Sequence, residues 1–230
     1  MKISVLEFTE GASQAEGVTV IIDVFRAFSV ACYAFYSGAV SVIATSGPNE
    51  AFRLKAKYIK PVLVGERNER KIEGFDFGNS PTEILTADLS GKTVILTTTA
   101  GTRGLLNAVK APVLLAAGLV NAGAVARYIG NLNPETVSLV AMGYKGETRA
   151  EEDIICARII ADRLAGREKD YTSQIALLKE TSGKRFFIPE NRMFSPPSDF
   201  FLCTMTDRFD FALKAERRHD GNIELIKTDI

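Results

Sequence analysis

The sequence of 230 residues contains no tryptophan, a single histidine and only three cysteines. The histidine, His219, lies in a turn-like segment near the C-terminus, and a Ser-His-Asp or Cys-His mechanism would have to depend on it. Cys32, Cys156 and Cys203 are widely separated and show no CxxC spacing, which argues against a zinc site and against a disulfide framework. We therefore expect reduced, buried thiols in a cytoplasmic protein whose chemistry does not use histidine.

The chain also lacks an excess of charge of either sign and a long apolar run. Its 28 basic and 28 acidic residues cancel, so no overall field would attract nucleic acid or an anionic membrane. No apolar run reaches the roughly 18 residues that span a bilayer, and the strand-like segment 3–8 follows Met1-Lys2 without a signal-peptide pattern. These absences predict a protein without nucleic-acid or membrane partners, in which any preference for anions arises locally.

What the sequence does contain is an alternation of strand-like and helix-like segments up to about residue 142. This alternation predicts a three-layer α/β/α fold with a mainly parallel or mixed sheet. Strands are expected at 3–8, 18–22, 39–45, 61–64, 92–97, 113–117 and 137–142, and helices at 27–37, 49–59 and 122–132, with a short helix opening at Pro81.

The pattern after residue 142 is less regular. A helix is expected at 150–165, followed by helices at 171–179 and 199–204 with a loop at 189–197 between them. The turn sequence His219-Asp220-Gly221-Asn222 predicts a C-terminal β-hairpin from segments 211–217 and 223–228. We expect one α/β domain over residues 1–230, with a possible C-terminal subregion from about residue 168.

The most informative stretch runs from Val18 to Arg26. Residues 18–22 are apolar or β-branched, as a strand buried on both faces requires. Asp23 follows at the carboxyl end of this strand, where ligands bind in open α/β sheets, and Arg26 comes three residues later. A carboxylate and a guanidinium there suit a metal-assisted reaction on an anion. The alternative is that Asp23 caps the next helix and pairs with Arg26.

Three further polar clusters also follow predicted strands: Glu66/Arg67, Thr97–Thr102 and Glu151/Glu152/Asp153. If the strands are parallel, these clusters and the Asp23/Arg26 pair meet at one edge of the sheet. Backbone N–H groups and hydroxyls of the threonine loop would bind an anion there, although threonines that merely cap the next helix are common. The loop is not a Walker A motif.

The acidic clusters predict a site for a hard divalent cation. Such cations take carboxylate oxygens, and the absence of a His/Cys cluster favours Mg²⁺ over zinc. Acids at 151–153 are also favoured at a helix N-terminus without any metal, and the charges of the long loop 65–80 are otherwise ordinary solvated side chains.

With these segments in view, the chain resembles the 2-phosphosulfolactate phosphatase family. The resemblance rests on the order and the length of its matching motifs, which span about residues 20 to 160. The motifs are Ile22–Phe28 (IDVFRAF), Gly65–Arg67 with Lys71–Ile72, Gly74–Pro81 (GFDFGNSP), Thr97–Thr102 (TTTAGT) and Glu152–Asp153 with Cys156–Ala157.

The resemblance implies a magnesium-dependent acid phosphatase that hydrolyses (2R)-2-phospho-3-sulfolactate to 3-sulfolactate and phosphate, on a route to coenzyme M. Two departures bear on the identity of the substrate. Ala100 stands where an asparagine is expected, and Asn68-Glu69 replaces a glycine pair. The first removes a possible hydrogen bond to the substrate, and the second stiffens the loop.

From the clusters and the resemblance together we predict the site residues. The predicted catalytic residues are Asp23 and Arg26. The predicted metal ligands are Asp23, Glu66, Glu152 and Asp153. The predicted substrate-binding residues are Arg26, Arg67, Asn79, Ser80, Thr98, Thr99, Gly101 and Thr102. Arg70, Lys71 and Arg103 are further cations in the same loops.

Several alternatives stay open. Asp23 could be a nucleophile that forms an aspartyl-phosphate, but haloacid-dehalogenase-type phosphatases carry a second Asp where this chain has Phe25, which favours the ligand role. Segment 21–28 also looks like the first strand of isochorismatase-like hydrolases, although no cysteine follows a strand as that mechanism needs. A non-enzymatic anion-binding module is the third alternative. A homodimer is a common assembly for α/β enzymes of this size, and the sequence does not decide the oligomeric state.

Overall fold

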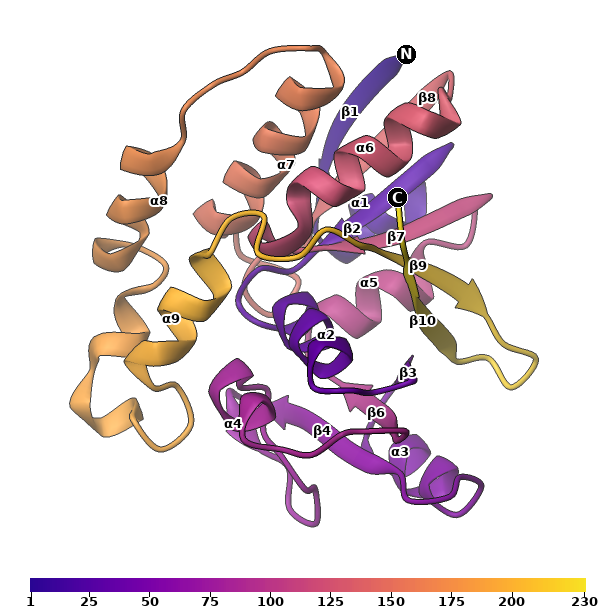
Figure 1. The fold of residues 1–230 in the computed structure, drawn as a ribbon, viewed down its shortest axis with the longest axis vertical. Coiled ribbons are helices and arrows are strands. Elements are labelled where there is room, and N and C mark those ends of the chain that lie inside the picture. Colours follow the sequence, from indigo (N-terminus) through magenta and orange to yellow (C-terminus); the bar gives the residue numbers. More distant parts are fainter.

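Strand β2 (Val18–Ile22) is buried along its whole length, as its apolar run predicts. The computed structural model describes residues 1–230 and places β2 between two parallel neighbours, β7 (Val113–Ala117) and β8 (Thr136–Ala141). Strand β1 (Lys2–Glu7) adds to β8, also parallel, and forms one edge of the sheet. These four strands make the first of two parallel groups (Figure 1).

The second parallel group contains three strands. Strand β6 (Thr93–Thr97) lies between β3 (Ser41–Ala44) and β4 (Val62–Arg67), and all three are parallel. A two-residue strand, β5 (Arg70–Lys71), pairs with β4 in the antiparallel sense at the far edge.

The C-terminal hairpin joins the two groups. Strand β9 (Ala212–Arg217) pairs antiparallel with β7, and β10 (Ile223–Thr228) pairs antiparallel with β3. The predicted hairpin is therefore present, but it occupies the middle of a ten-stranded mixed sheet with the order β1-β8-β2-β7-β9-β10-β3-β6-β4-β5.

Helices cover both faces of the sheet, because side chains alternate across each strand. In β2, Ile21 belongs to one apolar cluster, and Val18, Val20 and Ile22 belong to the other. The first face carries α1 (Phe8–Gln14), α2 (Ala27–Tyr36), α4 (Pro81–Leu85) and α5 (Gly101–Asn107). The second face carries α6 (Ala122–Leu132) and α7 (Glu151–Leu164), and a small separate cluster forms under α3 (Pro48–Lys55). Helix α1 was not predicted, whereas the bounds of α6 agree with the sequence pattern.

A mainly helical segment completes the chain before the hairpin. It contains α8 (Thr172–Leu177), α9 (Pro197–Thr204) and the short 3-10 helices Leu178–Glu180, Lys184–Phe187 and Pro189–Asn191. Another 3-10 turn, Leu119–Asn121, precedes α6. The helical segment lies on the side toward which β2 and β4 point (Figure 1). Every helix in the structure is too short or too polar to span a bilayer.

Candidate active site

A small cleft lies where the carboxyl ends of both parallel groups meet. Its walls include Asp23 after β2, Glu66 at the end of β4, Thr98 and Thr99 after β6, and Gly143 after β8. The cleft encloses about 50 Å³. The predicted convergence is therefore confirmed for three of the four clusters, even though an antiparallel hairpin separates the two groups in the sheet; the acids at 151–153 do not line the cleft.

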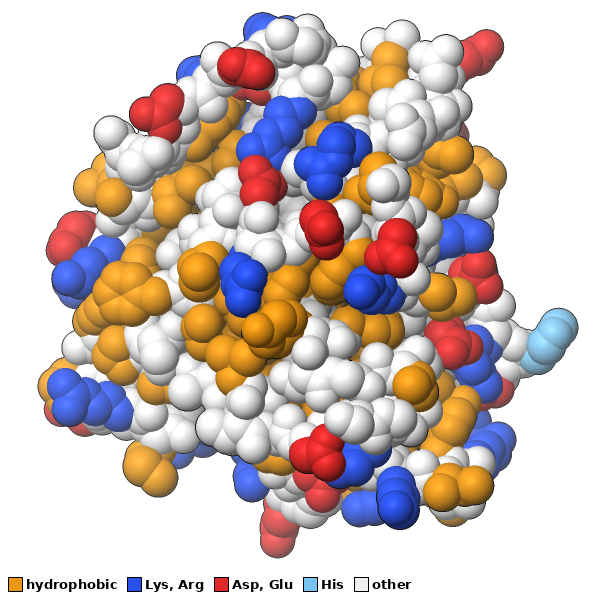
Figure 2. Space-filling view, viewed as in Figure 1, with side chains coloured by type: hydrophobic (Ala, Val, Ile, Leu, Met, Phe, Trp, Pro, Cys, Tyr) orange, Lys and Arg blue, Asp and Glu red, His pale blue; other side chains and the backbone are white.

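A second, larger groove of about 1280 Å³ lies elsewhere, between α6 and the connection from α7 to α8. Four of its charged side chains form two ion pairs, Arg163–Asp207 and Arg167–Asp162. None of the predicted site residues lines it, so its size does not make it the better candidate. Basic and acidic side chains are interspersed over the face of the molecule that Figure 2 shows, so charge is organised locally.

Asp23 is buried at the carboxyl end of β2. One of its carboxylate oxygens accepts the Ala27 N–H over 3.2 Å, so the acid does cap α2, as the structural alternative predicts. It also lines the cleft. Burial, with the negative charges of Glu66 and Glu152 nearby, raises the pKa of Asp23 to about 6, although hydrogen bonds from Ala27 and Gly101 oppose the shift.

Glu66 ties β4 to the loop that follows β6. Its Oε1 accepts the Thr99 N–H over 2.7 Å, and its Oε2 accepts the Glu69 N–H over 2.9 Å. The Gly101 N–H is also directed at a carboxylate, that of Asp23. The Thr99 N–H, which could bind a substrate anion, is thus held by an acid.

Thr98 and Thr102 are bound to each other. The Thr102 hydroxyl accepts the Thr98 N–H over 3.1 Å and donates to the Thr98 carbonyl over 2.9 Å, and the Thr98 hydroxyl accepts the Thr102 N–H over 3.3 Å. These contacts shape the start of α5. The Thr99 hydroxyl, in contrast, is buried at the cleft without a partner.

The close fit around Gly101 explains a glycine at this position. A Cβ atom there would lie 2.7 Å from Oδ2 of Asp23 and 2.8 Å from the Cβ of Ala27. The glycine therefore allows α5 and α2 to meet around the Asp23 carboxylate.

The two predicted acids on α7 have different environments. Asp153 accepts the Val24 N–H and the Gly143 N–H, both over 2.8 Å, and so fastens the ends of β2 and β8 together. Burial and the nearby charges of Glu152 and Asp23 raise its pKa well above the usual range. Glu152 is buried and its Oε2 has no partner; burial raises its pKa, and the charge of Arg185 opposes that rise. Neither acid lines the cleft, and their roles as metal ligands stay predictions.

The oxygen atoms at the cleft suit a Mg²⁺ ion whose remaining coordination positions would be filled by substrate and water. No three His, Cys, Asp or Glu side chains are arranged to hold a metal ion by themselves. Mg²⁺ is commonly bound by only one or two carboxylates together with substrate phosphate oxygens and water. Asp23 and Glu66 supply two carboxylates, and Asn79 Oδ1 is a buried acceptor without a partner that lines the same cleft. An acceptor of this kind suits a cation or its water shell.

Arg26, after β2, and Arg67, the last residue of β4, are placed differently. Arg26 lines the cleft and donates through Nη1 to Oδ2 of Asp199 over 2.6 Å and to the Phe194 carbonyl over 2.8 Å. It does not pair with Asp23. Arg67 donates to the Thr97 hydroxyl and the Glu66 carbonyl and is not among the residues that line the cleft. Its role in substrate binding stays a prediction.

Ser80 acts as the cap of α4. Its hydroxyl accepts the Glu83 N–H over 3.3 Å and donates to Asp199 over 2.8 Å. It therefore holds the loop that carries Asn79, and it is not itself part of the cleft wall.

Several cleft residues were not predicted from the sequence. Arg185, from the 3-10 helix Lys184–Phe187, donates to the Phe25 carbonyl over 3.1 Å and lies 3.6 Å from the Glu69 carboxylate. Lys145, after β8, donates to Asn68 over 3.2 Å. The only sequence signal at Arg185 is that two basic residues are followed by two aromatic residues, in Lys184-Arg185-Phe186-Phe187. Nothing in the sequence places Arg185 at the same cleft as Asp23.

Asn68 and Glu69 occupy the positions where a glycine pair was expected. Both have left-handed backbone, with φ of 53° and 67°, a conformation that costs a non-glycine residue roughly 1 kcal/mol. The loop keeps the glycine-like path and gains two side chains that reach the cleft cations Lys145 and Arg185.

Comparison with known proteins gives one consistent result. A family model described as 2-phosphosulpholactate phosphatase matches residues 5–188. A probable 2-phosphosulfolactate phosphatase of Clostridium perfringens (strain SM101) is 38% identical over 100% of this chain and 98% of its own length. Proteins with the same name from Bacillus subtilis (strain 168) and Caldanaerobacter subterraneus subsp. tengcongensis are 32% and 42% identical; the first match covers 91% of both chains, and the second covers 63% of this chain and 60% of the relative.

Proposed function

The chain belongs to the 2-phosphosulfolactate phosphatase family, and we propose that it hydrolyses (2R)-2-phospho-3-sulfolactate to 3-sulfolactate and inorganic phosphate with Mg²⁺. The observation that carries the proposal is the make-up of the cleft. Three carboxylates, those of Asp23, Glu66 and Glu69, share it with the cations Arg26, Lys145 and Arg185. A phosphate ester with further anionic groups requires both kinds of residue.

Asp23 and Glu66 are the proposed protein ligands of Mg²⁺. The raised pKa of Asp23 shows that a negative charge is unfavourable at this buried position next to other acids. A divalent cation would offset that charge. When bound, Mg²⁺ would neutralise phosphoryl oxygens and help to orient the attacking group. Glu66 holds its position through the Thr99 and Glu69 N–H groups. Whether Asp23 serves as ligand or as nucleophile is the remaining alternative within this proposal.

The cations of the cleft would bind the anionic groups of the substrate. The Nη1 of Arg26 is occupied by protein acceptors, whereas its Nη2 and Nε make no hydrogen bond within the protein. Arg185 comes from the C-terminal helical segment and lies among the rings of Phe25, Tyr144 and Phe186. Guanidinium groups bind carboxylate and sulfonate oxygens through paired donors, so these two arginines suit the three anionic groups of phosphosulfolactate better than one cation would.

The present cleft is smaller than a substrate needs. Ligand sites usually enclose 300–1,000 Å³, against about 50 Å³ here. Among the residues that line it, Asn68 contacts Lys145 and Glu69 contacts Arg185, and the substrate anions would compete for the same two cations. Binding would therefore open the turn between β4 and β5.

The cellular setting forms part of the proposal. The product would enter a route to coenzyme M. The buried free thiols of Cys32, Cys156 and Cys203 support a reducing compartment such as the cytoplasm.

The isochorismatase-like alternative has little support from the site. It needs a reactive thiolate at the cleft, whereas burial raises the pKa of all three thiols and none of them lines the cleft.

The deciding experiment measures phosphate release from (2R)-2-phospho-3-sulfolactate and from a neutral aryl phosphate, each with Mg²⁺ and with EDTA. The proposal requires release that depends on Mg²⁺ and favours phosphosulfolactate. Release from both substrates in EDTA would contradict the role of the metal, and an equal preference would contradict the substrate. No release under any condition, with binding of the intact ester, would support the anion-binding module.

A further inference from the structure

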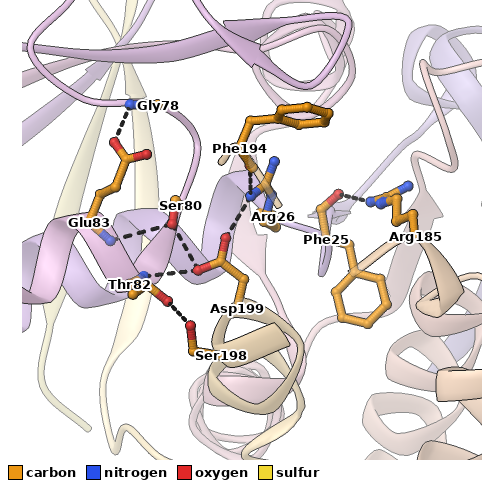
Figure 3. Close-up of polar contacts among 10 residues, drawn as sticks. All are labelled: Phe25, Arg26, Gly78, Ser80, Thr82, Glu83, Arg185, Phe194, Ser198 and Asp199. Carbon is orange, nitrogen blue, oxygen red and sulfur yellow. Dashed lines mark hydrogen bonds and ion pairs between the residues drawn. The ribbon is translucent and has the colours of Figure 1, made fainter. Parts of the chain in front are cut away.

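Asp199, at the start of α9, connects three segments that are far apart in the sequence. Its Oδ2 accepts from Arg26 Nη1 over 2.6 Å, and its Oδ1 accepts from the Ser80 hydroxyl over 2.8 Å and the Thr82 N–H over 3.0 Å (Figure 3). The Asp199 side chain is completely buried and that of Arg26 is 3% exposed. One carboxylate therefore fixes the loop after β2 and the start of α4 against α9.

The geometry of Arg26 shows what this contact does at the cleft. Both of its protein acceptors, Asp199 Oδ2 and the Phe194 carbonyl, lie on Nη1 and come from the C-terminal helical segment. Nη2 and Nε remain for a ligand. Because the guanidinium is planar and its donors are fixed relative to one another, holding one nitrogen sets the direction of the others.

The other oxygen of Asp199 acts on the second wall of the cleft. Ser80 is the N-cap of α4 and Thr82 is the second residue of that helix. Asn79 directly precedes Ser80. Asn79 lines the cleft with an unpartnered oxygen. The position of Asn79 therefore depends on the same carboxylate that orients Arg26.

We infer that Asp199 is a positioning residue for the phosphatase reaction, which orients the Arg26 guanidinium toward the substrate anion and holds the Asn79 loop at the cleft. This inference rests on the proposed function. The C-terminal helical segment thereby takes part in the site, because the contact between α9 and α4 and the alignment of Arg26 depend on the same carboxylate. Asp199 touches neither the substrate nor the metal in this scheme.

The test is a double-mutant cycle with Asp199→Asn and Arg26→Gln, read out as kcat and KM for Mg²⁺-dependent hydrolysis. Asp199→Asn keeps the size of the side chain and an acceptor for Ser80 and Thr82, but it removes the anionic acceptor of Arg26. We expect roughly a 10- to 100-fold loss in kcat/KM, the order that a misplaced binding group produces. In the Arg26→Gln background, the same change should cost less than about twofold, because no guanidinium is left to orient.

Ser198→Ala provides the matched control. Ser198 is exposed, neighbours Asp199 on α9, and bonds the Thr82 hydroxyl over 2.7 Å without reaching Arg26. This variant should keep wild-type kinetics. Equal losses from Asp199→Asn in both Arg26 backgrounds would show that Asp199 only supports the fold, and no loss in either would also overturn the inference.

Two further points keep the outcomes distinct. If Asp199→Asn does not fold, as judged by circular dichroism, the cycle is run with Asp199→Glu, which keeps the charge and displaces the carboxylate from Arg26, Ser80 and Thr82 alike. The displaced Asn79 loop then costs activity in both backgrounds. A larger loss with Arg26 present than in the Arg26→Gln background supports the inference, and an equal loss contradicts it. If the wild-type protein releases no phosphate, the proposed function fails. If the wild type is active and the cycle shows no coupling, only the role of Asp199 fails.

Discussion

The Glu66 carboxylate accepts the backbone N–H of Thr99 over 2.7 Å, so the end of β4 is joined to the loop after β6 through an acid. The loop was expected to offer its N–H groups to a phosphate. In the structure, Glu66 holds the Thr99 N–H, and Asp23 is in close approach to Gly101. The acids are thereby kept in place at the cleft, where a cation could bind them together with the substrate.

The first prediction concerns Asp23. Asp23→Asn removes charge from a proposed metal ligand and should lower turnover of phosphosulfolactate by at least about two orders of magnitude. Phosphate release at saturating Mg²⁺ measures the effect. The exposed acid Glu168 provides the control, because Glu168→Gln lies far from the cleft and should leave turnover unchanged. Full activity of Asp23→Asn in the presence of EDTA would exclude both a ligand and a nucleophile role.

The second prediction concerns stability against pH without metal. Burial raises the pKa of Asp23 from 3.8 to about 6, so the folded state binds this proton more tightly than the unfolded state. The stabilising contribution is complete below about pH 3.8 and is lost as the pH rises through 6. The full effect of such a shift is about 3 kcal/mol.

The measurement is urea unfolding in EDTA at pH 4 and pH 7.5, for the wild type and Asp23→Asn. The variant cannot ionise at this position, so it should gain stability relative to the wild type at the higher pH. Groups that do not interact with Asp23 act on both proteins and cancel in the difference. The pKa of Asp153 is raised in part by the charge of Asp23, so its relaxation in the variant adds to the gain at the higher pH. A stability difference that does not change with pH would show that the Asp23 pKa is close to normal.

The third prediction concerns Gly101. Gly101→Val would place side-chain atoms where Oδ2 of Asp23 and the Cβ of Ala27 already lie, so it should displace Asp23 and strongly reduce kcat/KM. Gly130 lies in α6 with no atom within 4 Å of an added Cβ. Gly130→Ala should therefore keep wild-type kinetics and gain roughly 0.5–1 kcal/mol in stability. Unchanged kinetics in Gly101→Val would make the close approach to Asp23 irrelevant to the reaction.

The fourth prediction separates the arginines by substrate. Arg26→Lys and Arg185→Lys should lose more kcat/KM on phosphosulfolactate than on a neutral aryl phosphate, with a gap of roughly 1.5–3 kcal/mol, the worth of a hydrogen bond to a charged group. Arg67→Lys should show no such gap if its contacts with Thr97 and Glu66 are its only role. Equal losses on both substrates would assign an arginine to the transferred phosphoryl group, and a gap for Arg67 would restore it to the substrate site.

Local patterns in the sequence were sufficient to predict most helices and strands and the cleft residues at the carboxyl ends of β2, β4 and β6. The apolar run of β2 is visible because both of its faces are buried, and Asp23 is visible because it ends that run. Helix α1 was missed because Phe8–Gln14 contains a glycine and little apolar periodicity.

The residues that the C-terminal helical segment contributes to the site could not be predicted from local sequence patterns. Asp199 looks like an ordinary acid in the first turn of a short helix, and only tertiary packing shows that it faces Arg26. Arg185 lies in a segment of short 3-10 turns without a regular pattern. Asp153 illustrates the opposite case: an acid at a helix start was a plausible ligand, but its oxygens accept N–H groups from the ends of two strands.

The central position of the β9–β10 hairpin has a consequence for the order in which the protein can fold during synthesis. Strands β9 and β10 follow all the other strands in the chain, so the partners of β7 and β3 on that side are synthesised after both parallel groups. A nascent chain that has formed both parallel groups before the hairpin would leave β7 and β3 open, each able to pair with another chain. The β9–β10 hairpin is thus the only part of the sheet that connects the group whose strand ends at Asp23 to the group whose strand carries Glu66.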